Sequence, residues 1–212
     1  MEYIIKYLGS EDVNENVKMV FFEKPNGFKF IPGHTAMISI EKEGMKESLV
    51  PFTFISTNKD PYLAFAIKKR EGKISEEMHK LQIGDKVKIN SIFGTIRYKG
   101  VGNFIVSGIA ITPVISIMRD LKLNDKETRG NKLIWSNGFE KDIIFLDELE
   151  SYFGKDNIIH TLTKERKDGF LFGRIGKNII NNIKKDENNY VIGSDEFVFD
   201  VRKIISELFK KI

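Results

Sequence analysis

The sequence pattern changes near residues 98–102, and this change constrains the fold more than any other feature. Before it, short β-rich runs recur between turn signals such as Pro25-Asn26-Gly27 and Gly84-Asp85. After it, apolar runs typical of strands alternate with helical segments. The first pattern predicts a small antiparallel barrel, and the second predicts a parallel sheet with helices on both faces. We therefore expect two domains, over residues 1–98 and 99–212.

In the first half we expect a six-stranded barrel interrupted by one helix, with Ser75 as the helix N-cap and Met78 and Leu81 on its apolar face. The six expected strands are Tyr3–Tyr7, Val17–Phe22, Ala36–Ile40, Phe52–Ser56, Tyr62–Ile67 and Lys86–Ile89. The expected strands of the second half are Asn103–Ser107, Leu133–Ser136, Ile158–Leu162 and Tyr190–Ile192. Its helices are expected after a Thr112 cap with Pro113 in first position, at Asp147–Tyr152, at Lys177–Lys184 and at Phe197–Lys210.

Composition excludes several kinds of chemistry. The chain has no cysteine, which excludes thiolate nucleophiles, Cys-ligated zinc and an iron–sulfur cluster held by this chain. Its three histidines are scattered, so no metal site is expected. The net charge of +4 is too small to indicate a nucleic-acid or membrane partner. No signal peptide is recognised at the N-terminus, and we expect a cytoplasmic protein.

The segment Phe52-Thr53, after Pro51, joins an aromatic ring to a hydroxyl. A flat aromatic cofactor needs a ring to stack on and a polar group at its edge, and this pair offers both. Adjacent strand residues point to opposite faces, however, so a bend near Pro51 is needed to bring both to one ligand. Taken alone, the segment is more typical of a core strand.

Two glycine-containing turns are candidate phosphate sites. Gly72-Lys73-Ile74-Ser75 precedes a helix, where free N–H groups attract anions, although Glu76 and Glu77 weaken that interpretation. Gly108 ends a buried strand and is followed by the helix start Thr112-Pro113. This is the position at which open α/β sheets bind nucleotides, but Ala110 stands where a second glycine of the dinucleotide fingerprint would be.

Two cations follow the third strand of the second half. Lys164 and Arg174 are suited to holding a phosphate, because Arg grips phosphate with two parallel hydrogen bonds. A solvated run of charge is the commoner explanation for such residues.

Taken in order, these motifs resemble those of the ferredoxin–NADP reductase superfamily, especially the bacterial flavodoxin and ferredoxin reductases. The resemblance covers most of the chain. The matching segments are Phe30-Ile31-Pro32-Gly33-His34, Val50-Pro51-Phe52-Thr53, Gly72-x-x-Ser75, Leu81-x-x-Gly84-Asp85-x-Val87, Phe93-Gly94, Gly108-Ile109-Ala110-Ile111-Thr112-Pro113, Ser136-Asn137, Asp142-Ile143-Ile144-Phe145, Glu148-Leu149, Val191-Ile192-Gly193 and Phe197.

The resemblance implies a flavin-binding barrel, with FAD or alternatively FMN, and a C-terminal NAD(P)-binding α/β domain. The implied flavin residues are Pro51, Phe52, Thr53, Ile67, Lys69, Gly72, Lys73, Ile74 and Ser75, with the Thr53 hydroxyl near flavin N5 as the catalytic group. The implied NAD(P) residues are Gly108, Ile109, Thr112, Pro113, Asn137, Lys164, Arg174 and Gly193. Lys164 and Arg174 occupy positions that hold the 2′-phosphate of NADPH in bacterial flavodoxin reductases, so NADP(H) is favoured over NAD(H).

The implied activity is hydride transfer from NAD(P)H to flavin N5, with the electrons passed to ferredoxin, flavodoxin or a small-molecule acceptor. Three residues depart from the family pattern. Val50 replaces an arginine that contacts the flavin phosphate, Ile192 replaces a cysteine beside the nicotinamide, and Gly138 stands where an arginine is common. These departures leave two alternatives open: an electron-transfer or interaction subunit with a weakened flavin site, and a reductase of free flavin.

Overall fold

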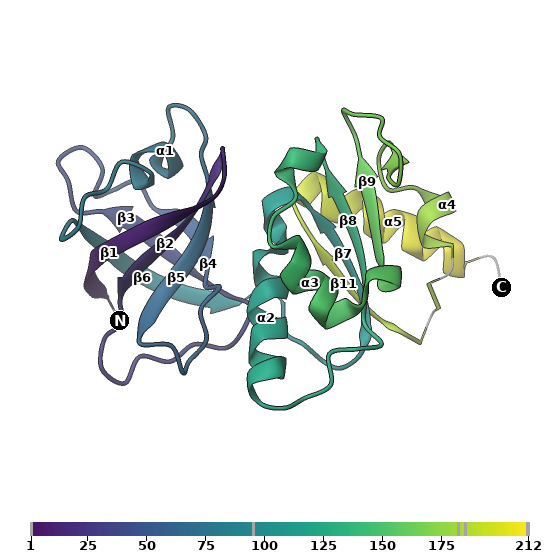
Figure 1. The fold of residues 1–212 in the computed structure, drawn as a ribbon, viewed down its shortest axis with the longest axis horizontal. Coiled ribbons are helices and arrows are strands. Elements are labelled where there is room, and N and C mark those ends of the chain that lie inside the picture. The colour runs from purple at the N-terminus through teal and green to yellow at the C-terminus, as the bar shows by residue number, and fades with distance from the viewer. Residues whose placement is uncertain (1, 95, 182, 185, 211–212) are drawn as a thin grey trace. The chain divides into compact units, whose positions relative to one another are not determined.

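The structure, a computed structural model, describes residues 2–94, 96–181, 183–184 and 186–210. The chain divides into two compact units, which are Met1–Arg97 with Thr112–Leu123, and Tyr98–Ile111 with Asn124–Ile212. Figure 1 labels their helices and strands. Within the described ranges, no helix combines the length and the apolar character needed to cross a bilayer.

The first unit contains a six-stranded antiparallel sheet in the order β4-β3-β6-β1-β2-β5. The strands are β1 (Tyr3–Asn14), β2 (Val17–Glu23), β3 (His34–Ile40), β4 (Val50–Thr53), β5 (Tyr62–Lys68) and β6 (Lys86–Gly94). Beyond the end of β4, Phe54 forms an isolated bridge with Phe65 of the other edge strand. The predicted six-stranded antiparallel fold is confirmed. Within the described residues, the edge strands β4 and β5 are joined by this one isolated bridge and not by a continuous ladder of hydrogen bonds.

Aromatic rings fill the centre of the first unit. Phe54 and Phe65 are fully buried, and Phe30 stacks on Phe54 with ring centroids 4.3 Å apart. All five central residues of β5 are buried, which explains why this strand reads as an almost continuous apolar run. The core therefore depends on the aromatic content of the first half rather than on strict polar–apolar alternation.

Two helices belong to the first unit, and both start differently from the prediction. Helix α1 (Ile74–Met78) has Lys73 as its N-cap, so the prediction of Ser75 as cap is wrong, and Ser75 is buried within the helix. Helix α2 (Thr112–Leu123) follows a 3₁₀ turn, η1 (Gly108–Ile111), and begins at Thr112 itself. Because η1 already supplies the helical backbone, Thr112 is the first residue of α2 rather than a cap.

Two hydrogen bonds hold α2 to loops of the first unit. The Gly33 N–H donates to Ser116 Oγ at 3.1 Å, and Arg119 Nη1 donates to the Ile55 carbonyl at 2.7 Å. Ser116 and the Gly33 amide are buried, so these bonds satisfy polar groups that burial would otherwise penalise.

The second unit contains a five-stranded parallel sheet in the order β10-β9-β8-β7-β11, as predicted for this half of the chain. The strands are β7 (Gly102–Ser107), β8 (Lys132–Asn137), β9 (Ile158–Leu162), β10 (Leu171–Phe172) and β11 (Asn188–Ile192). The helices are α3 (Leu146–Phe153), α4 (Lys177–Ile180) and α5 (Asp195–Phe209), and the 3₁₀ turns are η2 (Glu140–Asp142) and η3 (Lys155–Asn157).

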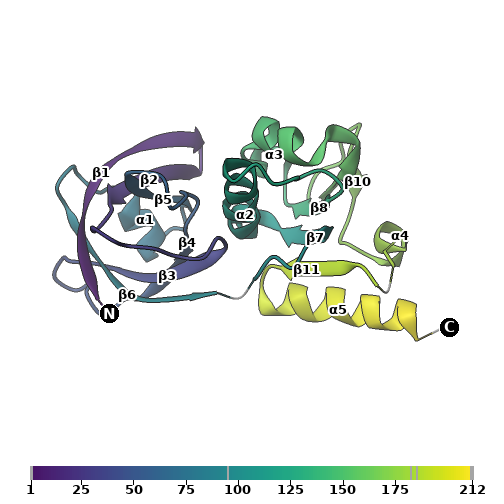
Figure 2. The ribbon, with the colours of Figure 1, turned by 90° about the horizontal axis from the view of Figure 1, so that it is seen from below.

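Successive side chains of the parallel strands point to opposite faces of this sheet. Ile105 and Val191 pack in one cluster with α4 and α5. On the other face, Phe104 stacks on Tyr190 at 4.5 Å and meets Phe153 of α3 edge-on. Figure 2 shows α5 running alongside β11, which it contacts. Both faces are apolar, as parallel strands covered by helices require.

Several boundaries differ from the prediction. β1 and β6 extend to Asn14 and Gly94, while β4 ends at Thr53 instead of Ser56. The short edge strand β10 carries too little pattern to be recognised from sequence. Helix α4 ends at Ile180, because the Asn-rich continuation favours helix weakly. Residue 182 of the predicted helix lies outside the described residues.

Candidate functional site

A cavity of about 270 Å³ lies at the carboxyl ends of the central strands of the second unit. Its walls come from the ends of β7, β8 and β9, from the segment after β10 and from the first turns of α5. The lining residues are Ser107, Gly108, Ser136, Asn137, Gly138, Thr163, Arg174, Ile175, Ser194, Glu196, Phe197, Asp200 and Val201.

The position of this cavity follows from the strand order. The chain proceeds from β7 through β8 and β9 to β10 on one side, then returns to β11 on the other side of β7. The connections leaving β7 and β11 therefore separate, and open α/β sheets bind ligands at such a switch point, beyond the carboxyl ends of the strands.

A tryptophan fixes the turn that leaves β7. Gly108 adopts a positive φ of 52°, which a glycine accepts at little cost. Its carbonyl accepts a hydrogen bond from the indole Nε1–H of the fully buried Trp135 at 3.0 Å. The buried Trp135 of the sheet core therefore fixes the position of the cavity wall at Gly108.

Close packing around Gly193 fixes the opposite wall. A Cβ atom at Gly193 would lie 2.5 Å from the Phe197 ring and 3.2 Å from Ser107 Cβ. The Ser194 hydroxyl caps α5 by accepting the Phe197 N–H at 3.3 Å. A side chain at position 193 would force α5 away from the end of β7.

Asn137 leaves unmet hydrogen-bonding capacity at the cavity wall. The residue is only 4% exposed, and neither its Nδ2 nor its Oδ1 has a hydrogen-bond partner among the described residues. Its backbone carbonyl accepts from the N–H and the hydroxyl of Thr163, at 2.9 and 3.2 Å. These bonds fix the end of β8 against β9, while the side-chain amide remains available for a ligand.

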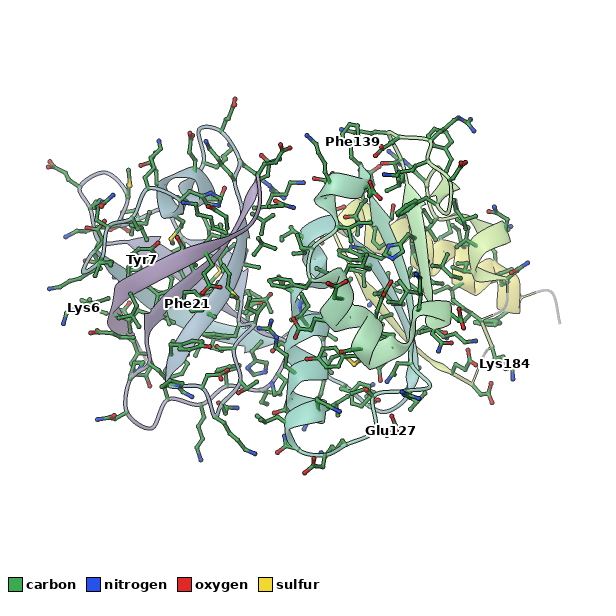
Figure 3. All side chains as sticks on the ribbon, viewed as in Figure 1. Lys6, Tyr7, Phe21, Glu127, Phe139 and Lys184 are labelled. Carbon is green, nitrogen blue, oxygen red and sulfur yellow. The ribbon has the colours of Figure 1, made fainter. Side chains whose placement is uncertain are left out.

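The charged groups around the cavity are mostly exposed. Arg174 Nη1 lies 3.4 Å from Glu196 Oε1, and the two side chains are 82% and 75% exposed. Asp200 lines the same cavity one helical turn after Glu196. Lys164 places its Nζ 5.9 Å from the centroid of the Phe139 ring, labelled in Figure 3. Such exposed pairs add little to stability but set the local potential.

In the first unit, β4 carries the predicted aromatic–hydroxyl pair. Phe52 is half-buried, lies opposite Ala36 in the β3–β4 ladder and packs against the barrel core. The Thr53 hydroxyl lies 3.0 Å from the Thr35 hydroxyl. Pro51 is exposed.

The segment from β5 into α1 combines buried and exposed groups. The Ile67 side chain is buried in the barrel core, and its carbonyl lies 2.8 Å from His79 Nε2. Burial lowers the pKa of His79. Lys69 and Lys73 are exposed, and Ile74 packs against the core. The two lysines are thus the outward-facing members of this predicted flavin set.

A carboxylate occupies the backbone donor at Gly72. The Gly72 N–H donates to Glu76 Oε2 at 2.8 Å, and this bond, assisted by the Lys80 and Lys69 cations, lowers the pKa of Glu76. The hydroxyl of Ser75 is buried without a partner in the described part of the chain. Of the two donors expected to bind a phosphate, the Gly72 N–H is therefore already bonded to Glu76, whereas the Ser75 hydroxyl has no partner among the described residues.

Comparison with known proteins agrees with this geometry. The family model described as "Oxidoreductase NAD-binding domain" matches residues 104–203. The cytochrome b5 reductase domain of Ulva prolifera nitrate reductase superposes with a TM-score of 0.84 at 17% identity, covering 98% of this chain and 93% of that one. The chain has the fold of the ferredoxin–NADP reductase superfamily. A ferredoxin NADP⁺ reductase from Neisseria gonorrhoeae with bound FAD and NADP gives a TM-score of 0.79 at 18% identity, covering 98% and 91%.

Relatives with similar sequences carry related names. NADH-cytochrome b5 reductase 2 of Mycosarcoma maydis is 27% identical over 181 residues, which are 77% of this chain and 51% of the relative. NADH-cytochrome b5 reductase 1 of Aspergillus terreus is 30% identical over 162 residues, covering 69% and 54%. The chain therefore spans about half the length of these relatives. Their names specify NADH, so they do not support the predicted preference for NADP(H).

The second unit brings together some of the predicted nucleotide residues. Gly108, Asn137 and Arg174 line the cavity, whereas Ile109, Lys164 and Gly193 lie in the same unit without lining it. Thr112 and Pro113 open α2, which groups with the first unit. Sequence reasoning missed Ser107, Ser136, Thr163, Ser194, Glu196 and Asp200 as lining residues. The first four of these could have been predicted as lining residues, because each is a small hydroxyl residue that ends or follows a buried strand.

The barrel residues are compatible with a bound flavin if one internal hydrogen bond is exchanged for a bond to the ligand. Phe52 offers a ring face, the Thr35–Thr53 pair offers a hydroxyl, and Ser75 offers an unused buried donor. For a phosphate to reach the Gly72 N–H, the Glu76 carboxylate must release it. The donor set is therefore compatible with a flavin phosphate, although Val50 supplies no positive charge.

Proposed function

We propose that this protein is a flavin-dependent NAD(P)H oxidoreductase with a nucleotide-binding α/β domain over residues 99–212 and a flavin-binding barrel over 1–98. The observation that carries the proposal is the cavity at the switch point of the parallel sheet, with its glycine turn and its unpaired Asn137 amide. The matching domain model and the names of the relatives support the same chemistry.

The cavity suits part of a dinucleotide rather than the whole. Its volume of about 270 Å³ is slightly below the roughly 300–1,000 Å³ of pockets that enclose small ligands. Gly108 lets the backbone approach a pyrophosphate, and the Ser107, Ser136 and Thr163 hydroxyls border the same space. These groups position the dinucleotide, while the redox chemistry belongs to the nicotinamide.

The barrel would hold FAD, or FMN, through Phe52, Thr53 and the segment from Lys69 to Ser75. A bound flavin would supply the hydride-accepting and electron-transferring chemistry, which the side chains of this protein cannot supply themselves. Phe52 would cover the ring, Thr53 would present its hydroxyl to N5, and Ser75 with Lys73 would bind phosphate. The contribution of this chain is positioning, which supplies much of the rate advantage in such reactions.

The electron acceptor is a carrier protein or a small molecule. The relatives are named for cytochrome b5, and one structural neighbour is named a ferredoxin reductase. Ferredoxin and flavodoxin remain predictions from the sequence resemblance.

Two observations favour a second candidate, a reductase that uses free flavin as substrate. The Glu76 carboxylate at Gly72 and the apolar Val50 both disfavour a flavin phosphate, so the flavin is bound more weakly than with an arginine at position 50. An interaction subunit without turnover is the remaining alternative.

The test is the visible spectrum of the purified protein, followed by anaerobic addition of NADH or NADPH. A resident flavin that bleaches on addition supports the proposed oxidoreductase. Colourless protein that reduces added FAD or FMN supports the free-flavin reductase. Absence of both a flavin spectrum and turnover contradicts both functions and leaves the interaction subunit.

A further inference from the structure

The cavity wall carries more negative than positive charge. Among the lining residues, Arg174 is the cation, while Glu196 and Asp200 are carboxylates. Arg174 Nη1 already lies 3.4 Å from Glu196 Oε1, and Asp200 adds a second carboxylate to the lining. A ligand group that enters this region therefore meets two carboxylates, which accept hydrogen bonds, and one guanidinium.

The Asn137 amide adds an independent constraint on the ligand. Its Oδ1 needs a donor and its Nδ2 needs an acceptor, because both are buried without partners in the described structure. A sugar hydroxyl donates one hydrogen bond and accepts others, so it can satisfy an amide oxygen or a carboxylate. A phosphate dianion only accepts, so it leaves those oxygens unpaired and adds repulsion.

We propose that Glu196 and Asp200 make this cavity select NADH over NADPH, by accepting hydrogen bonds from the free 2′-hydroxyl and repelling the 2′-phosphate. The inference rests on the proposed function, and it reverses the preference for NADP(H) predicted from Lys164 and Arg174.

Lys164 and Arg174, on which the predicted preference for NADP(H) rested, are poorly placed to offset the charge of these carboxylates. Lys164 does not line the cavity, and its ammonium lies over the Phe139 ring. Arg174 is 82% exposed and shares its charge with Glu196. Because Arg174 already faces the Glu196 carboxylate, it attracts a phosphate dianion less than a free guanidinium would.

The experiment compares calorimetric titrations of NAD⁺ and NADP⁺ into the purified protein, with 5′-ADP and 2′,5′-ADP as a second pair that differs only by the 2′-phosphate. The test variant is Glu196→Gln with Asp200→Asn, which keeps size and removes charge. The matched control is Asp195→Asn, on the same helix but outside the cavity lining.

We expect the parent protein to bind NAD⁺ at least about tenfold more tightly than NADP⁺, a difference of about 1.4 kcal/mol. The double variant should reduce this ratio to about threefold or less, mainly by gaining affinity for NADP⁺. The control should keep the parent ratio. Added salt should narrow the parent ratio, because the repulsion is between exposed charges.

Equal or tighter binding of NADP⁺ by the parent protein overturns the inference and leaves the proposed function intact. A preference for NAD⁺ that the double variant retains also overturns it, because the carboxylates would then not be its cause. Failure of the parent to bind either dinucleotide overturns both the inference and the proposed function.

Discussion

The two candidate sites differ in what their polar groups already contact. In the second unit, the Asn137 amide has no partner among the described residues and lies beside a formed cavity, and the Trp135 bond holds the Gly108 turn in place. In the barrel, the Thr53 hydroxyl is paired with Thr35, and the Gly72 N–H with Glu76. The candidate nucleotide site thus has polar groups ready for a ligand, whereas the candidate flavin site would have to exchange internal hydrogen bonds for ligand bonds.

This difference indicates where each affinity is controlled. An exchange of one internal hydrogen bond for a ligand bond is nearly neutral in free energy, but it also brings a phosphate beside the Glu76 carboxylate. In the second unit no such exchange is needed, and we propose that charge at the rim of the cavity controls which dinucleotide binds. We therefore expect flavin affinity to depend on Glu76 and dinucleotide choice on Glu196 and Asp200.

The largest expected effect tests the rigidity of the two sheets. A Cβ atom at Gly102 would lie 2.2 Å from the backbone oxygen of Asn188, whereas a Cβ at Gly94 would meet the His34 side chain at 2.4 Å. Gly102→Ala should lower the free energy of unfolding by about 3 kcal/mol, because backbone cannot move aside. Gly94→Ala, the matched change in the barrel, should cost about 1 kcal/mol. Urea unfolding followed by circular dichroism measures the unfolding free energy of each variant. Equal losses in Gly102→Ala and Gly94→Ala would contradict the expected difference between the two sheets.

The next effect concerns the aromatic face of the barrel. Phe52→Ala should weaken flavin binding by about 2 kcal/mol, or about 30-fold, by removing the ring that stacks on the flavin. Phe199→Ala is the control, because Phe199 is 68% exposed on α5 in the other unit. Equilibrium dialysis with FAD gives the affinities. Unchanged FAD affinity in Phe52→Ala would place the flavin elsewhere.

A smaller gain is expected from neutralising the carboxylate at Gly72. Glu76→Gln should increase FAD affinity about threefold to tenfold, because the phosphate no longer meets a negative charge. Glu77→Gln is the matched control, since Glu77 pairs with Lys80 at 2.8 Å instead of with the Gly72 N–H. An equal gain in both variants would show that only overall charge matters, and no gain in Glu76→Gln would separate Gly72 from the flavin phosphate.

The smallest effect is the pH dependence of stability. Burial lowers the pKa of His160 below its ordinary 6.5, so the unfolded chain binds the proton more readily. His160 therefore contributes stability that is present above pH 6.5 and lost as the pH falls below it. The melting temperature of the second unit, followed by Trp135 fluorescence, should fall by a few degrees between about pH 7.5 and about pH 5.5.

His160→Gln should reduce that fall, while His79→Gln should leave it unchanged, because His79 lies in the first unit. The Trp135 signal is specific, since the chain has one tryptophan. A melting temperature with the same pH dependence in His160→Gln as in the parent would contradict the assignment to His160.

Local patterns predicted the fold well where burial dominates. The apolar runs of β5, β7 and β8 identify buried strands, and their alternation with helices predicts the parallel sheet. The two-residue strand β10 is held by pairing with β9 and carries no pattern of its own. Ser75 was misassigned because capping depends on where the backbone turns, and Lys73 already occupies that position.

The site was predictable only in part. Gly108 and Asn137 follow or end buried strands, so their place at the cavity follows from topology. Glu196 and Asp200 look like the solvated face of an amphipathic helix, and the approach of Glu196 to Arg174 arises from tertiary packing that the sequence does not display. The acidic first turn of α1 already argued against a phosphate there, and the bond from Gly72 to Glu76 supplies the physical cause.

A crystal structure of the protein with NAD⁺ tests most directly whether the cavity beyond β7 and β8 holds a nicotinamide dinucleotide, as we propose. We expect the pyrophosphate to lie against the Gly108 turn and a sugar hydroxyl to bond to the Asn137 amide. A dinucleotide bound at another surface, with this cavity filled by solvent, would contradict the claim.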